Sequence, residues 1–243
     1  MACQEGAAAG RPPAAIRGVI TDFGGVLTNP ISATVTAWLD AERIDKASYQ
    51  AVMRAWMTPG PSLDSPASSA GRAGAAGDHS PVHALERGEC TVAEFEALLA
   101  AELVTVDGQP VAAEGLLARM FAATVLDEPM LELIRVARRA GLRTAMLSNS
   151  WGGSDYPREL FPELFDVTVI SAEVGMRKPE ERIFRHTATL LGLEPAECVF
   201  IDDIAVNVQA AEALGLVAVQ HSAYPDTAAR LGALLGISLP QRS

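Results

Sequence analysis

The stretch Val19-Ile-Thr-Asp-Phe-Gly-Gly-Val-Leu27 runs from apolar and β-branched residues to an acidic residue, Asp22, and then into two glycines. We interpret it as a buried strand that ends at Asp22 and leads into a glycine turn. A carboxylate in this position lies at the carboxyl end of a strand, where open α/β sheets bind their ligands. Three later segments offer chemical partners for it: Ser148, Lys178 and the pair Asp202-Asp203.

Composition and charge narrow the class of protein. The chain has 243 residues, of which 49% are hydrophobic and 20% charged, and this suits one large domain or a core with a smaller insert. The formal net charge is −11, and no run of lysine and arginine offsets it. Because such a surface repels a polyanion, we expect no nucleic-acid partner.

The cysteines and the N-terminal segment bear on the compartment. Cys3, Cys90 and Cys198 are far apart and fit neither a zinc spacing nor a disulfide framework, so we expect a cytoplasmic protein. Residues 1–15 are rich in Ala, Gly and Pro without an apolar signal segment, and we interpret them as a disordered tail. No apolar run approaches the ~18 residues of a membrane span, so we expect no membrane partner.

The C-terminal half alternates strand and helix patterns. We expect strands at 142–147, 164–171, 198–201 and 216–220, separated by helices and followed by a last helix from residue 226. The run at 198–201 is apolar without interruption, which is typical of a strand buried on both faces. Strands that alternate with helices predict an α/β fold with a doubly wound, Rossmann-like parallel sheet as its core.

The segment 29–126 has a different, helical periodicity. Four groups of apolar residues recur at helical spacing, and Thr91 and Glu94 form the sequence of a capping box. We therefore expect a bundle of about four helices over 29–126, inserted into a core made of 16–28 and 127–243. Within it, 59–80 is dense in Pro, Gly, Ser and Ala and is interpreted as a mobile loop.

Asp22, Ser148 and Lys178 are each open to two readings. Asp22 suits a nucleophile that takes up a phosphoryl group, but an aspartate can also simply end a strand and cap a turn. Ser148, followed by Asn149, could hold phosphoryl oxygens through its hydroxyl and backbone amides, although such residues commonly make turns. Lys178 could offset the charge of a phosphate, while most lysines are solvated.

The pair Asp202-Asp203 follows the buried run Val199-Phe-Ile201. Two adjacent carboxylates repel each other unless a cation lies between them, and Mg²⁺ prefers one or two carboxylates together with water and phosphate oxygens. The alternative is a pair that caps the next helix. Asn207 lies one helical turn further on and could support a metal site by hydrogen bonding.

Taken in order, these motifs resemble the haloacid dehalogenase-like (HAD) hydrolase superfamily, in the branch with sugar-1-phosphate phosphatases and the phosphatase domain of soluble epoxide hydrolase. The resemblance implies Asp22 as the nucleophile. It implies phosphate binding by Ser148 and Lys178, to which we add Asn149 and Gly25, and it counts Lys178 as catalytic. It also implies a magnesium site at Asp22, Asp203 and the backbone carbonyl of Gly24, with Asp202 and Asn207 in support. Ser148 lies 126 positions after Asp22, and for this spacing the family implies a helical cap of the first insertion type.

One departure from the family pattern concerns Gly24. Family phosphatases usually carry a second aspartate at this position, as general acid and then general base. General acid–base catalysis is worth ~10²–10⁴ in rate. We therefore predict a phosphatase of a small phosphorylated metabolite that is slow, or limited to good leaving groups such as anomeric, acyl or aryl phosphates. Glu86 or Arg87 in the cap could compensate.

Two other functions remain open from the sequence. In a 2-haloacid dehalogenase Asp22 would attack carbon, and the halide would leave without an acid. Against this function, a magnesium-free enzyme that attacks an anionic acid has no use for the two carboxylates Asp202 and Asp203. A non-catalytic phosphate-ligand binding module would also explain Gly24.

Trp38 and Trp56 in the expected cap further suggest a possible homodimer through that region.

Overall fold

The computed structural model describes residues 15–57, 80–152 and 156–239. The expected tail at 1–15 and the expected loop at 59–80 lie outside these ranges, except for one terminal residue of each. Of these, Ser80 caps the helix that begins at Pro81: its hydroxyl accepts a hydrogen bond from the backbone N–H of His83. Among the described helices, none combines the length and apolar character that crossing a bilayer requires.

The core is a five-stranded parallel sheet with the order β3-β2-β1-β4-β5. The first strand therefore lies in the middle, between β2 and β4. This arrangement confirms the predicted doubly wound α/β core. The strands are β1 (Gly18–Thr21), β2 (Arg143–Ser148), β3 (Val167–Ile170), β4 (Cys198–Asp202) and β5 (Val217–Gln220).

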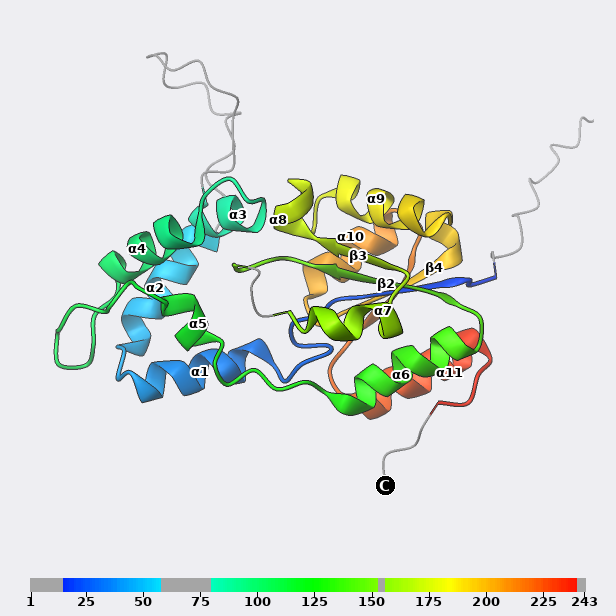
Figure 1. Ribbon diagram of the computed structural model, residues 1–243, viewed down its shortest axis with the longest axis horizontal. Helices are drawn as coiled ribbons and strands as arrows, with labels where there is room; N and C mark the ends of the chain where they lie inside the picture. The colour runs from blue at the N-terminus through cyan, green and yellow to red at the C-terminus, as the bar shows by residue number, and fades with distance from the viewer. Residues whose placement is uncertain (1–14, 58–79, 153–155, 240–243) are drawn as a thin grey trace, which may run out of the picture.

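Helices cover both faces of this sheet (Figure 1). One face packs against α6 (Glu128–Arg139), α7 (Phe161–Leu164) and α11 (Tyr224–Leu235). The other packs against α9 (Glu181–Leu191) and α10 (Ala205–Ala213). Successive strand residues alternate between the two cores, as Val19 and Ile20 do, because side chains on a strand point to opposite faces. Both faces are therefore buried, which explains the continuous apolar runs in the sequence.

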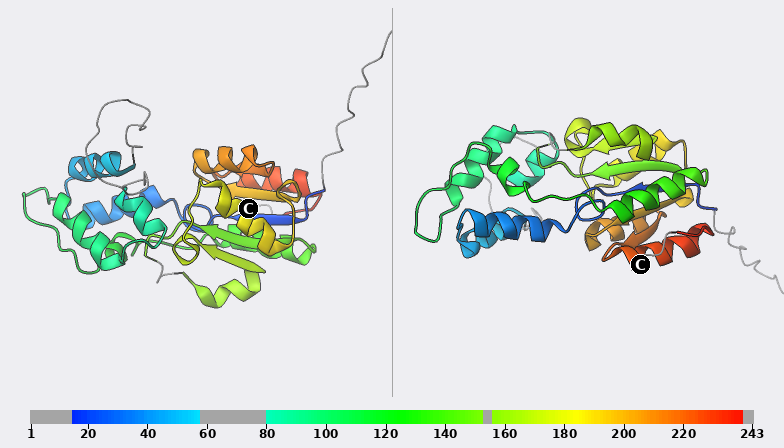
Figure 2. Two further views of the ribbon diagram at one scale, coloured as in Figure 1. Left: turned by 90° about the horizontal axis from the view of Figure 1, so that it is seen from above. Right: turned by 60° about the horizontal axis from the view of Figure 1, so that its bottom comes forward.

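The helical insertion has a hydrophobic cluster of its own. Figure 2 shows its helices grouped at one end of the sheet. Thr91 and Glu94 form the predicted capping box at the start of α4, with both reciprocal bonds present. An antiparallel bridge between Thr28 and Leu126 joins the chain where it leaves and re-enters the core. The helices are α1 (Ile31–Ala41), α2 (Lys46–Met57), α3 (Pro81–Glu86), α4 (Val92–Glu102) and α5 (Leu116–Met120).

Some boundaries differ from those expected. The segment 164–171, expected as one strand, divides into the end of α7, the short strand β3 and the start of α8 (Ser171–Val174). Its apolar residues are shared among three elements, so their continuity in sequence was misleading. The last helix begins at Tyr224, two residues before the expected start, with a proline in its first turn, where a missing N–H is tolerated.

Candidate active site

Asp22 lies directly after β1, and the residue is 6% exposed. Its backbone N–H continues the sheet by donating to the carbonyl of Ile201 at 2.8 Å. One carboxylate oxygen accepts from the N–H of Phe23 at 2.7 Å. Burial raises the pKa of Asp22 to about 7, with Asp202 and Asp203 adding to the rise and Lys178 opposing it. The reading of Asp22 as a plain strand-end cap leaves this buried charge cluster unexplained.

Lys178 is the cation of the cluster and is only 1% exposed, so it is not a solvated lysine. Its Nζ lies 2.8 Å from a carboxylate oxygen of Asp22 and 2.7 Å from one of Asp202. The side chain of Asn149 fixes the backbone of Lys178 on both sides: its amide donates to the carbonyl at 3.0 Å, and its oxygen accepts from the N–H at 2.8 Å. Burial favours the neutral amine, but the two carboxylates outweigh it and raise the pKa of Lys178.

The two adjacent aspartates have different surroundings. Both carboxylate oxygens of Asp202 accept hydrogen bonds, from Lys178, from the amide of Asn207 and from the N–H of Ile204. Oδ1 of Asp203 is buried and has no hydrogen-bond partner among the described residues. Burial and the neighbouring Asp202 raise the pKa of Asp203. A buried carboxylate oxygen without a partner is unfavourable, so Asp203 is a natural place for a cation.

A metal ion fits this donor set. Carboxylate oxygens of Asp22, Asp202 and Asp203 all lie within 4.8 Å of one another. Such a group of oxygens suits a hard divalent cation, and Asp203 has a free oxygen for it. Gly25 lies against Asp203. Its φ is +76°, and its backbone is so near that a side chain there would collide with the Asp203 carboxylate.

Ser148 ends β2, and its hydroxyl accepts a hydrogen bond from the hydroxyl of Tyr156 at 2.8 Å. Tyr156 packs on Phe23, with 4.9 Å between the ring centroids. Burial raises the pKa of Tyr156 to about 12, so this phenol stays protonated at neutral pH. Sequence reasoning missed Tyr156, because a lone tyrosine outside any periodic segment carries no signal.

Gly24 leaves the position of the usual acid without a side chain. The place where a Cβ would lie is 3.2 Å from Cδ1 of Ile31, so an apolar side chain from α1 fills this space. Neither cap residue considered as a substitute has a free charge. Glu86 pairs with Arg177 and accepts from the indole N–H of Trp151, and Arg87 pairs with Glu89 and Glu180.

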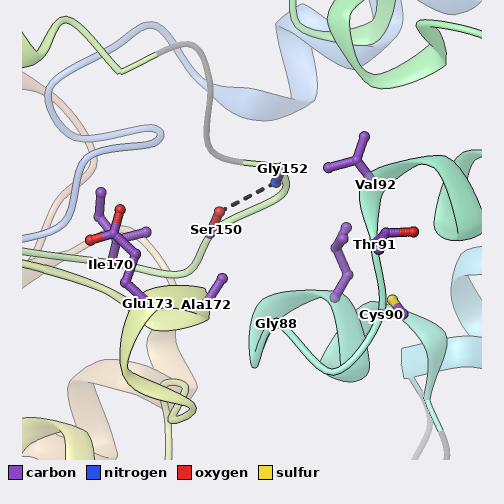
Figure 3. Close-up of a pocket in the computed structure, with 10 residues that line it drawn as sticks. Gly88, Cys90, Thr91, Val92, Ser150, Gly152, Ile170, Ala172 and Glu173 are labelled. Carbon is purple, nitrogen blue, oxygen red and sulfur yellow. Dashed lines mark hydrogen bonds between the residues drawn. The ribbon is translucent and has the colours of Figure 1, made fainter.

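These pairs connect the helical insertion to the core beside the site. Residues of α3 contact the segment that carries Lys178, and the turn at Gly88 lies against the backbone of Ala172 in α8. A small cavity of about 240 Å³ marks this junction, between the start of α4 and the ends of β2 and β3 (Figure 3). A larger cleft of about 860 Å³ shares Val92 and Gly152 with this cavity and is lined by Asp22, Ser148, Lys178 and Asp203.

The comparison with known families agrees with this arrangement. The model of the haloacid dehalogenase-like hydrolases matches residues 16–215. The chain belongs to this family. It is therefore a HAD-like hydrolase, as the order of its motifs predicted.

Curated relatives of this HAD-like hydrolase match in part of their length. Bifunctional epoxide hydrolase 2 of Rattus norvegicus is 30% identical over 105 residues, which are 40% of this chain and 19% of that protein. The sesquiterpene phosphatase astK of Aspergillus oryzae is 33% identical over 113 residues, 45% of this chain and 58% of that protein. The matched segment thus spans about a fifth of the epoxide hydrolase and less than two thirds of the phosphatase.

Solved structures share the fold. A HAD family enzyme of Bacteroides thetaiotaomicron, solved with magnesium and inorganic phosphate, superposes with a TM-score of 0.59 at 22% identity. The alignment covers 86% of this chain and 95% of that enzyme. A dehalogenase structure reaches a TM-score of 0.54 at 17% identity, covering 84% of each chain. At these identities the likeness concerns the fold alone.

Proposed function

We propose that this HAD-like hydrolase is a magnesium-dependent phosphatase that acts through an aspartyl-phosphate on Asp22. The observation that carries the proposal is the buried cluster of Asp22, Lys178, Asp202 and Asp203, whose free oxygen on Asp203 suits a cation. The names of the relatives support it, since they include a sesquiterpene phosphatase and a phosphoserine phosphatase of Thermus thermophilus.

Asp22, Lys178 and Ser148 have different roles in the proposed reaction. A carboxylate oxygen of Asp22 attacks phosphorus, and the bond from phosphorus to the leaving oxygen breaks. Water then cleaves the acyl phosphate, which returns Asp22 and releases inorganic phosphate. Lys178 offsets the negative charge between nucleophile and phosphoryl group, and the Ser148 hydroxyl with the backbone amide of Asn149 holds phosphoryl oxygens. The N–H of Gly25 donates to the hydroxyl of Thr28 at 3.0 Å and would join them only by leaving that partner.

Asp22, Asp203 and the backbone carbonyl of Gly24 would hold Mg²⁺, while Asp202 and Asn207 keep Lys178 and the loop in place. When bound, Mg²⁺ supplies positive charge that stabilises the phosphoryl oxygens. The same charge would favour the ionised form of Asp22, whose pKa burial otherwise raises to about 7.

Gly24 sets the limit of the proposed activity. No side chain at this position can protonate a leaving alkoxide, and Glu86 and Arg87 are engaged in ion pairs. The enzyme is therefore slow on alkyl phosphates of small alcohols and faster on esters whose leaving group is stable as an anion. The helical segment 29–126 serves as the cap over a phosphorylated small molecule. A cytoplasmic location, the absence of nucleic-acid or membrane partners and a homodimer through the cap remain predictions.

The test is hydrolysis of para-nitrophenyl phosphate with magnesium and with EDTA, using Asp22→Asn as the control. The phenolate leaves without being protonated, so hydrolysis of this substrate does not need the general acid that Gly24 lacks. We expect magnesium-dependent release that Asp22→Asn lowers by roughly 10⁴-fold or more. Asparagine keeps the shape of the side chain, and circular dichroism checks that the variant folds.

Two outcomes would overturn the proposal. Binding of inorganic phosphate without turnover would identify the non-catalytic binding module that Gly24 also allows. Metal-independent release of halide from a 2-haloacid, again lost in Asp22→Asn, would identify the dehalogenase.

A further inference from the structure

The larger cleft continues from the charged cluster into the helical insertion without a break. At about 860 Å³ it lies near the upper end of the range of ligand pockets. A group of the size of water or methylene occupies about 30 Å³, so the cleft has room for a phosphoryl group and roughly twenty further non-hydrogen atoms. A phosphoryl group at Asp22 would fill only its inner end.

The wall away from the charged cluster is apolar. Side chains from α1, α2 and α5 form most of it. The hydroxyl and amide groups at Ser32, Thr36 and Gln50 are exposed, and Tyr49 of α2 adds a half-buried phenol. The largest apolar contributors are Ile31, Val35, Leu39, Met53, Leu117 and Phe121.

The charged side chains on this wall are already engaged. Glu86 pairs with Arg177, and both oxygens of Glu96 accept backbone N–H groups, from Gly115 and Leu117. Lys46 pairs with Asp40 outside the apolar part. A sugar in this space would exchange its hydrogen bonds with water for apolar contacts, which is unfavourable for every hydroxyl left without a partner. A hydrocarbon would gain from the same contacts.

We propose that the substrate is a monophosphate ester of an apolar, long-chain alcohol, whose hydrocarbon lies along α1, α2 and α5 while its phosphoryl group lies at Asp22. This inference rests on the proposed phosphatase activity and names its substrate class. Water is the second reactant, the P–O bond to the alcohol oxygen breaks, and the alcohol and inorganic phosphate leave. Binding energy from the chain, remote from phosphorus, offsets part of the slow departure of an alkoxide that Gly24 leaves without an acid.

The test is a homologous series of ethyl, hexyl and decyl phosphate, with glycerol 3-phosphate as the polar comparison, all below their micellar concentrations. The leaving alkoxides are chemically alike, so differences report the cleft and not the chemical step. Each added methylene is expected to raise kcat/KM by two- to fourfold, up to the limit that full burial allows. Glycerol 3-phosphate should be no better than ethyl phosphate. A flat series, or a preference for glycerol 3-phosphate, would overturn the inference.

A pair of variants tests whether the preference for long chains arises at the apolar wall. Met53→Gln keeps the length of the side chain but makes the apolar wall polar, and it should lower the ratio of decyl to ethyl kcat/KM by about tenfold. Leu98→Gln is the matched control, because Leu98 is 51% exposed on α4 and lies outside the cleft. It should leave the ratio unchanged. Equal ratios in the two variants would place the hydrocarbon elsewhere.

A binding experiment separates this inference from the phosphatase proposal. Decylphosphonic acid cannot be hydrolysed, so calorimetry measures its affinity whether or not the protein is a catalyst. Tighter binding of decyl- than of ethylphosphonic acid supports the apolar site even if no ester is turned over. Turnover of para-nitrophenyl phosphate with equal binding of the two phosphonic acids would leave the phosphatase standing and remove the hydrocarbon substrate.

Discussion

The two walls of the large cleft are built on different physical principles. The core wall, made of Asp22, Ser148, Lys178, Asp202 and Asp203, carries buried charges. Lys178 lies between Asp22 and Asp202, and Asn207 donates to Asp202, while Oδ1 of Asp203 keeps no partner among the described residues. The helical wall carries apolar side chains whose contacts have no direction. A buried ion pair is stable only when the two charged groups keep a fixed geometry. An apolar surface, in contrast, tolerates exchanges between apolar residues of similar volume. The core wall therefore sets the chemistry, and the helical wall is free to set the substrate.

The largest expected effect concerns the cation of the core wall. Replacing Lys178 by methionine leaves Asp22 and Asp202 buried without a counter-charge. We expect the free energy of unfolding in EDTA to fall by about 3–5 kcal/mol. In the helical wall, Lys46→Met removes an exposed pair with Asp40 and should change it by no more than about 1 kcal/mol. Urea unfolding of both variants measures the difference.

Magnesium sharpens this test. If the three carboxylates hold a divalent cation, adding Mg²⁺ should recover part of the stability of Lys178→Met and should not affect the deficit of Lys46→Met. Equal losses of unfolding free energy in the two variants would mean that the buried carboxylates become protonated at little cost in stability. This result would contradict the contrast between the two walls.

The next effect concerns the place where the two walls meet, at Gly24 and Ile31. An aspartate at Gly24 needs the space that Ile31 fills, so we expect the double variant Gly24→Asp, Ile31→Ala to gain more than Gly24→Asp alone. Hydrolysis of ethyl phosphate should rise by roughly 10²-fold in the double variant, because the leaving alkoxide now receives a proton. Steady-state rates on ethyl phosphate measure the gain.

The controls for this gain are Ile31→Ala alone and the aryl substrate. Ile31→Ala enlarges the cleft without supplying an acid and should not speed ethyl phosphate hydrolysis. The rate on para-nitrophenyl phosphate should rise little, since its phenolate needs no proton. If the double variant gained nothing on ethyl phosphate, Gly24 would not be what limits the rate.

The residues of the core wall were predictable because they end strands. Asp22, Ser148 and Asp202 each follow or close a short apolar run, and parallel strands bring such ends together at one edge. Lys178 was predictable only from its motif, and its burial between two carboxylates was not. Tyr156 and the filling of the acid position by Ile31 could not be foreseen, because they depend on how loops and the insertion pack.

The helical wall was predictable as helices but not as a surface. Helical periodicity predicts the four apolar groups, and the pattern at Thr91 predicts the capping box. Helix α3 is not predicted, because it is only six residues long and follows a stretch rich in Pro, Gly and Ser. Which helix faces line the cleft and which pack inward is a tertiary question. The same limit explains why the sequence predicts one strand over 164–171: a short apolar run fits a strand or a buried helix equally.

The smallest expected effect tests whether the two walls are held together by the contact at α3. Glu86 is buried and pairs with Arg177 of the core, whereas Glu89, three residues on, is 54% exposed. Glu86→Gln leaves the Arg177 guanidinium without its counter-charge and should lower the free energy of unfolding by about 1–3 kcal/mol. Glu89→Gln should change it by less than about 1 kcal/mol, since Glu89 itself is exposed and Arg87 keeps its pair with Glu180. Chemical denaturation compares the two. Equal stability would mean that the other contacts, such as the Arg87–Glu180 pair and the packing of Gly88 on Ala172, are enough to join the insertion to the core. The pair of Glu86 with Arg177 would then only orient Arg177 next to Lys178.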